Sequence, residues 1–141
     1  MFPSTASIAC MSFRSELLDR LTEDNLLRDK AQKYCTAMTS FLKKNNIFYQ
    51  AADGCLRKSR AVSQCKEWIK DFLHLDGQWF YPEALASKET IISRTGATNL
   101  KGNFNQCRSY LIELINHIKK YHQDMEHLSP YYAIVAIDGD K

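Results

Sequence analysis

The chain contains few of the residues that interrupt regular structure, with 5 Gly and 3 Pro among 141 residues. With 45% hydrophobic and 25% charged residues, this composition excludes collagen-like, low-complexity and largely disordered proteins and fits one ordinary domain. Long apolar runs are also missing, because the longest, residues 131–137, has seven residues, whereas a membrane-spanning helix needs about 20. The N-terminus lacks the basic and apolar segments of a signal peptide. We therefore expect a cytoplasmic protein that does not associate with membranes.

Several sequence motifs of common catalytic and metal sites are missing as well. There is no glycine-rich phosphate loop, no C-x-x-C pair, and no Ser/His/Asp or Cys/His arrangement with a supporting local motif. The cysteines are odd in number and widely spaced, which argues against a disulfide framework or a zinc site: Cys10, Cys35, Cys55, Cys65 and Cys107. We expect Cys35, Cys65 and Cys107 to be buried free thiols on helix faces.

Apolar residues recur at intervals of three and four over most of the chain, which is the period of an amphipathic helix. The strictest stripe comprises Leu27, Ala31, Tyr34, Cys35, Met38, Phe41 and Leu42. Glu23 and Asp24 suit the positive start of this helix, and Asn45 suits its end. Ser87 and Gly96 can cap a shorter helix. The sequence predicts a mainly α, bundle-like fold of four or five helices around one core, over about residues 5–21, 22–45, 60–74, 87–94 and 104–125.

An aromatic cluster, Trp79, Phe80 and Tyr81, follows the third of these helices. Such a cluster can stack nucleic-acid bases or fill the space between helices, and packing is the favoured interpretation. Pro82 prevents this segment from lying inside a helix.

Three histidines lie near the end of the last predicted helix: His117, His122 and His127. Their five-residue spacing places them about 140° apart on a helix, so they cannot share a face as metal ligands would. We expect them, like His74, to be residues of helix C-termini, where the dipole favours them.

The period changes at the C-terminus, where residues 131–137 form a continuous apolar run. Such a run suits a strand buried on both faces of a sheet, yet no second strand is evident before it. We therefore expect a helical domain over residues 1–129 and the first strand of a truncated domain over residues 130–141. Asp138 and Asp140 would then lie at a sheet edge and suit Mg²⁺ or Mn²⁺, and Gly139 would allow a phosphate to approach closely. The alternative is a plain Asp-Gly hairpin turn.

Positive charge is concentrated in the middle of the chain. Residues 28–70 carry ten Lys and Arg against three Asp and Glu, whereas residues 1–27 and 71–141 each sum to −2. A basic segment can bind nucleic acid or an acidic partner, although a solvated helix face has the same composition. If this segment binds RNA or single-stranded DNA, the expected contacts are Lys43, Lys44, Arg57, Lys58 and Arg60.

Three stretches, in this order, resemble parts of one known family: residues 2–9 (FPSTASIA), residues 80–85 (FYPEAL) and residues 131–141 (YYAIVAIDGDK). They are similar to three parts of the large subunit of Cmr-type (type III-B) CRISPR effector complexes. These parts are the segment after the zinc-binding cysteines, a tract of the helical region, and the first strand of the palm domain. The intervening helices match only in length and character.

This resemblance implies a palm that is similar to nucleotidyl cyclases and polymerases and that, in many members, makes cyclic oligoadenylates from ATP when target RNA is bound. It implies that Asp138 binds Mg or Mn in the parent protein together with a later G-G-D-D hairpin. That hairpin, the nuclease HD motif and the zinc cysteines are missing from these residues. We therefore expect a catalytically inert helical linker that holds no cofactor by itself.

The same resemblance implies that the partners are the other subunits of the antiviral complex and, through them, guide RNA and target RNA. The alternative is an unrelated helical protein-interaction module with no catalytic role. A free-standing enzyme is not favoured, because the sequence shows no complete catalytic set.

Overall fold

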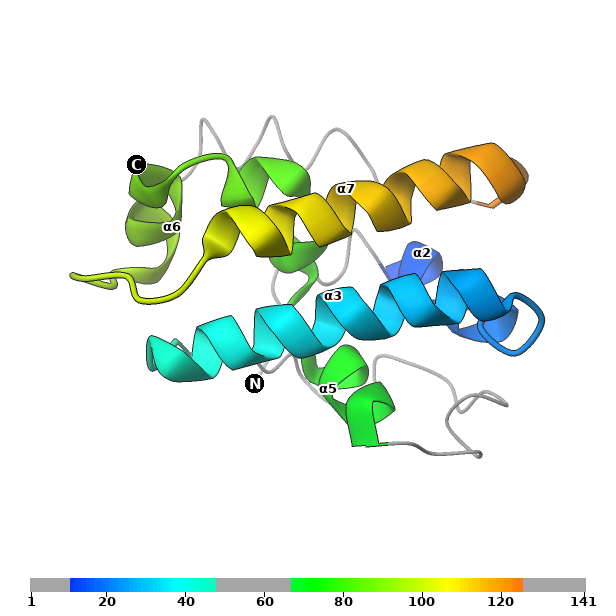
Figure 1. Cartoon of the computed structure of the whole chain (residues 1–141), viewed down its shortest axis with the longest axis horizontal. Helices are drawn as coiled ribbons and strands as arrows, with labels where there is room; N and C mark the ends of the chain where they lie inside the picture. The colour runs from blue at the N-terminus through cyan, green and yellow to red at the C-terminus, as the bar shows by residue number, and fades with distance from the viewer. Residues whose placement is uncertain (1–10, 48–66, 126–141) are drawn as a thin grey trace.

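The computed structural model describes residues 11–47 and 67–125. The regular structure of these residues is helical (Figure 1), which confirms the mainly α prediction. The α-helices are α2 (Met11–Arg20), α3 (Asn25–Lys44), α5 (Glu67–His74), α6 (Lys88–Thr95) and α7 (Phe104–Tyr121). Two 3₁₀ turns, η1 (Gly77–Phe80) and η2 (Pro82–Leu85), connect α5 to α6. The strand predicted at residues 131–137 and the predicted domain boundary after residue 129 lie outside the described residues.

Helix α3 has the buried face that its sequence predicts, although it begins at Asn25 and not at residue 22. Its start is capped by Asp24, whose side chain accepts a hydrogen bond from the N–H of Leu27 at 3.1 Å. Every residue of the predicted stripe is buried: Leu27, Ala31, Tyr34, Cys35, Met38, Phe41 and Leu42. The helix ends at Lys44 with Asn45 as its C-cap, and Asn46 then adopts a φ of 55°, a left-handed conformation that Asn tolerates better than most residues.

Helix α7 lies antiparallel beside α3 (Figure 1), so the start of α3 and the end of α7 share one end of the molecule. At the other end, Asn45 binds the loop that precedes α7. Its Nδ2 donates to the carbonyl of Lys101 at 2.8 Å, and its Oδ1 accepts from the N–H of Lys101 at 2.6 Å. Gly102 follows with a φ of 89°, and a Cβ there would lie 3.4 Å from Cδ2 of Phe41. The end of α3 is therefore hydrogen-bonded to the loop that precedes α7, in addition to the packing of the two helices along their lengths.

Helix α7 ends at Tyr121, so the prediction that it continues to Met125 is wrong. His122 leaves the helix with φ −133° and ψ 52°, while its N–H still donates to the carbonyl of Ile118 at 2.8 Å. The chain then turns, the N–H of Met125 donates to the carbonyl of His122 at 3.0 Å, and Met125 is buried. Met125 follows Tyr121 by four residues, which is also the spacing of one more helical turn. The sequence pattern is therefore the same whether Met125 is buried by a turn or by a continuing helix.

The aromatic cluster lies at the centre of the core. All three of its side chains are buried, which confirms the packing interpretation, because buried rings cannot stack on nucleic-acid bases. The ring of Phe80 meets three others edge-on, those of Phe13, Tyr34 and Phe72, with centroids 6.2, 6.2 and 5.5 Å away. The hydroxyl of Tyr34 donates to the carbonyl of Trp79. Because the three rings around Phe80 come from α2, α3 and α5, this turn joins those helices; burying one such ring stabilises the fold by about 2–3 kcal/mol.

Helix α6 begins and ends at the residues that the sequence predicts. Ser87 caps it, with Oγ accepting from the N–H of Thr90 at 3.1 Å. Gly96 ends it with a φ of 74°, and its N–H donates to the carbonyl of Ile92 at 2.8 Å. Both caps are local features, so they could be identified without knowledge of the tertiary structure.

Candidate functional site

Most of the site residues predicted from the sequence lie outside the described residues: Arg57, Lys58, Arg60, Asp138, Gly139 and Asp140. Lys43 and Lys44 are described, and both are exposed in the last turn of α3. Lys101 is exposed in the loop that Asn45 binds, so the tertiary structure adds a third lysine at this end of the molecule. Basic side chains at the end of a helix also interact favourably with its dipole.

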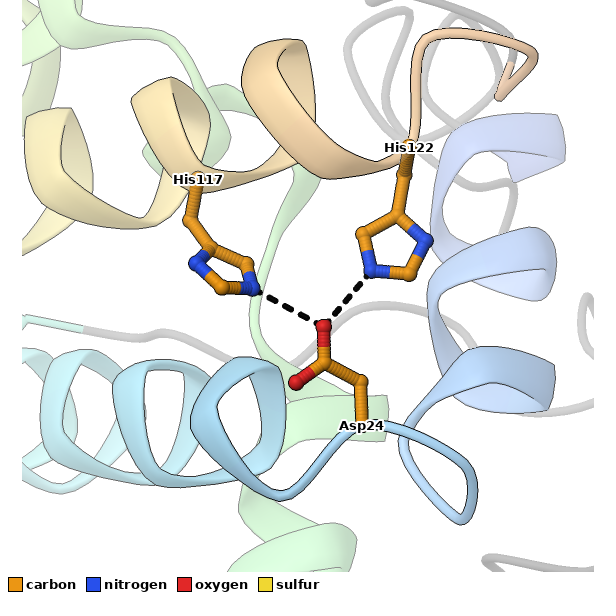
Figure 2. Close-up of side chains that lie close together, drawn as sticks. All are labelled: Asp24, His117 and His122. Carbon is orange, nitrogen blue, oxygen red and sulfur yellow. Dashed lines mark hydrogen bonds and ion pairs between the residues drawn. The ribbon is translucent and has the colours of Figure 1, made fainter.

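A cluster that the sequence did not predict lies at the opposite end of the α3–α7 pair (Figure 2). Nε2 of His117 and Nε2 of His122 lie 2.9 and 2.8 Å from the same atom, Oδ2 of Asp24. Asp24 immediately precedes α3, His117 lies in the last two turns of α7, and His122 follows that helix. One donor atom from each side chain lies within 4.8 Å of the other two. We call these three residues the Asp24 cluster.

The prediction that a five-residue spacing keeps His117 and His122 apart is therefore wrong. It assumed that α7 continues past His122, and the 100° step per residue holds only inside a helix. The backbone of His122 is not helical, and its ring points to Asp24 as the ring of His117 does (Figure 2). His127, the third histidine of the series, lies outside the described residues.

Asp24 uses its two carboxylate oxygens for different tasks. Oδ1 accepts from the N–H of Leu27 and caps α3, while Oδ2 faces the two imidazole rings. Burial by itself raises the pKa of Asp24, but the hydrogen bonds from His117 and His122 outweigh burial and hold this pKa well below its usual range. Because an ionised carboxylate can only accept hydrogen bonds, both rings carry a proton on Nε2.

Arg20, the last residue of α2, connects the cluster to a second carboxylate. Its Nη1 lies 3.2 Å from Nδ1 of His122, and since a guanidinium can only donate, Nδ1 of His122 is the acceptor in this contact. The same guanidinium donates to both oxygens of Asp124 at 3.0 and 2.9 Å. This pairing raises the pKa of Arg20 and lowers the pKa of Asp124. The end of α2, the start of α3 and the segment after α7 therefore meet at one hydrogen-bonded junction.

The cluster is partly shielded from solvent. The exposed fraction of the side chain is 6% for His117, 13% for His122 and 22% for Asp24. The ring of Tyr121 lies 4.7 Å from that of His117, centroid to centroid. Water and small ions can therefore reach the carboxylate, while the histidine rings are held by their surroundings. Two imidazoles and a carboxylate are groups that can hold either shared protons or a metal ion.

Two cysteines of the described residues behave as predicted. Cys35 and Cys107 are free and buried. Burial raises the pKa of Cys35 to about 12 and that of Cys107 to about 11, so both remain protonated thiols at neutral pH. Neither is therefore a nucleophile or a thiolate ligand in the folded chain. The third predicted thiol, Cys65, lies outside the described residues.

A comparison with protein-family models finds no match for this chain. Comparisons with curated proteins and with solved structures find no match either. Among the described helices, none combines the length and the apolar character that crossing a membrane requires.

Proposed function

We propose that the chain is a helical structural and interaction segment of the large subunit of an antiviral type III-B CRISPR effector complex, lying between its zinc-binding part and its palm. The observation that carries this proposal is the order of the three resembling stretches, residues 2–9, 80–85 and 131–141. In the parent subunit the palm binds ATP with Mg or Mn, and Asp138 is one of its ligands. The segment itself positions the palm and carries out no reaction.

The middle stretch supports a structural role, because its residues form part of the described core. Pro82 begins η2 and Glu83 is exposed, whereas the remaining side chains of the stretch are buried: Phe80, Tyr81, Ala84 and Leu85. The resemblance at this stretch therefore involves side chains that fill the centre of the helical domain. A segment that must hold two neighbouring domains in a fixed relation needs such a core.

The exposed lysines at the end of α3 support contact with RNA in the assembled complex. Lys43 and Lys44 belong to the basic segment 28–70, and Lys101 is brought to the same end by the hydrogen bonds of Asn45. Several lysines at one end can neutralise neighbouring phosphates of a single strand, and the released counterions favour binding.

The first experiment reads the coding sequence that follows codon 141. Met-Gly directly after Lys141, followed later by Gly-Gly-Asp-Asp, is the expected result, and a stop codon at that position would contradict the proposal. In the full-length protein, Asp138→Ala should abolish nucleotide turnover and leave assembly with the other subunits intact. Full turnover in this variant would remove Asp138 from the metal site.

The second experiment measures binding of a single-stranded RNA to the chain at several salt concentrations. Replacing Lys43 and Lys44 by Ala should weaken binding and reduce the slope of log K against log salt by about 1.4, since each lost phosphate contact on a single strand contributes about 0.7. The matched control replaces Lys119 and Lys120, two exposed lysines in the last turn of α7, and should leave the slope unchanged. An unchanged slope after replacement of Lys43 and Lys44 would show that the contact at the end of α3 does not exist.

A further inference from the structure

We propose that the Asp24 cluster is a binding site for one divalent transition-metal ion, with Zn²⁺ the best-suited ion, through Oδ2 of Asp24 and Nε2 of His117 and His122. The proposal is independent of the proposed CRISPR function, because it rests only on the geometry of the described residues. The packing of α3 against α7 does not by itself require the side chains of Asp24, His117 and His122 to meet, and a bound metal ion would give their meeting a role.

The donor atoms have the chemistry and the spacing of a zinc site. Zinc in proteins binds imidazole nitrogens at about 2.0–2.1 Å and carboxylate oxygens at about 2.0–2.2 Å, so tetrahedral ligands of one ion lie about 3.3 Å apart. Nε2 of His117 and Nε2 of His122 lie 2.9 and 2.8 Å from Oδ2 of Asp24, and all three atoms lie within 4.8 Å of one another. Shifts of about 0.5 Å in each nitrogen–oxygen distance, and closer approach of the two nitrogens, would accommodate the ion. Two imidazoles with one carboxylate favour Zn²⁺, Co²⁺ or Ni²⁺ over Mg²⁺ and Ca²⁺, which prefer sites made entirely of oxygens.

The carboxylate is already oriented for this task. The N–H of Leu27 holds Oδ1 of Asp24 at 3.1 Å, and this contact turns Oδ2 towards the two rings. Hydrogen bonds of this kind to the second atom of a ligand commonly fix its direction in metal sites. The ring of His117 is held by burial and by the neighbouring ring of Tyr121. The metal would therefore meet ligands whose side-chain freedom is already reduced.

Binding requires that the two Nε2 protons leave the nitrogens that the metal occupies. A ring in its neutral form can do so by taking the tautomer that carries its proton on Nδ1. At His122 this change ends the hydrogen bond from Nη1 of Arg20, whereas the paired hydrogen bonds from Arg20 to Asp124 remain. The metal thus replaces two shared protons and one arginine contact.

Access and coordination number indicate an open site. Asp24 is 22% exposed, so an ion can enter from the side of the carboxylate. Three protein ligands leave a fourth tetrahedral position for water or for a donor from another molecule. A bound ion would join residues more than ninety positions apart in sequence and thereby tie α7 to the start of α3. Since it binds only the folded chain, it would also raise the melting temperature.

The experiment titrates Co²⁺, as a spectroscopic substitute for Zn²⁺, into the metal-free 141-residue chain. The expected result is one equivalent of Co²⁺ with the visible absorption of tetrahedral cobalt, without the near-ultraviolet band of cobalt thiolate, and displaced by Zn²⁺. Absence of the visible bands in the unmodified chain would overturn the proposal and leave the cluster as a hydrogen-bonded contact only. A thiolate band would place the ion on cysteines and overturn it equally.

Two variants and one control assign the ion to the cluster. His117→Ala and Asp24→Asn should each weaken Co²⁺ binding by at least about 100-fold, because each removes one of three ligands. Asp24→Asn can still cap α3, so its loss of binding would not reflect loss of that helix. The control, Asp29→Asn, removes an exposed carboxylate from the same helix and should bind Co²⁺ as the unmodified chain does. Unchanged binding in either cluster variant, with circular dichroism confirming the fold, would show that the ion binds elsewhere.

Discussion

Replacing Asp24 by Ala tests how much the Asp24 cluster stabilises the metal-free fold. The change removes the N-cap of α3, where Oδ1 accepts from Leu27, at a cost of about 1 kcal/mol. It also leaves the Nε2 donors of His117 and His122 without their acceptor, and each such loss at a partly buried group costs about 1 kcal/mol. The sum is a loss of about 3 kcal/mol in the free energy of unfolding. For a chain of this length that loss lowers the melting temperature by about 10 °C.

Asp24→Asn separates the two contributions. The amide still caps the helix, and either histidine can change tautomer and accept from the amide NH₂, so we expect a loss of about 1 kcal/mol. Asp29→Ala, on the exposed face of α3, serves as the control and should stay within about 0.5 kcal/mol of the unmodified chain. The measurement is chemical denaturation followed by circular dichroism in the presence of a chelator. An Ala variant within about 1 kcal/mol of the unmodified chain would refute the reasoning, and equal losses for Ala and Asn would refute the contribution assigned to the cap.

Three further predictions concern the caps, the loop contact and the thiols. Gly96→Ala should lower the free energy of unfolding by about 1 kcal/mol, because a residue with a Cβ is strained at a φ of 74°, and Gly96→Asn should lower it less. Thermal denaturation in which the Ala variant is as stable as the unmodified chain would contradict this. Asn45→Ala should lower the free energy of unfolding by about 1–2 kcal/mol, because it removes the two hydrogen bonds to the loop at Lys101. The control, Asn105→Ala at an exposed position, should be neutral, and a reversed order in chemical denaturation would be inconsistent with that contact. Cys35 and Cys107 should resist thiol reagents at pH 8 until the chain unfolds. Rapid labelling of the folded chain would show that they are accessible. Their folded pKa values of about 12 and about 11 exceed the ordinary 9.0, so the stability that the two thiols contribute is complete below pH 9. It is lost as the pH rises through the folded pKa values.

The sequence by itself determined the helices and the buried face of the longest one. The stripe that begins at Leu27 is buried throughout, and the caps Ser87 and Gly96 lie where the sequence predicts them. These features are local, because helical periodicity and capping depend on residues within one or two turns of each other. The same reasoning correctly identified the buried thiols of Cys35 and Cys107, which lie on apolar stripes.

Only the tertiary structure decided which polar groups meet. In the sequence, Asp24 is indistinguishable from any acidic residue at the start of a helix. Its contacts to His117 and His122 join residues that are 93 and 98 positions apart. The end of α7 was decided in the same way, since the turn that buries Met125 and directs His122 to Asp24 replaces helical hydrogen bonds. The burial of Arg14, whose guanidinium carbon lies 4.9 Å from the centroid of the Phe80 ring, also has no signal in the sequence. Apolar periodicity specifies which face of a helix is buried, but the partner of a polar side chain depends on how the helices are placed against each other.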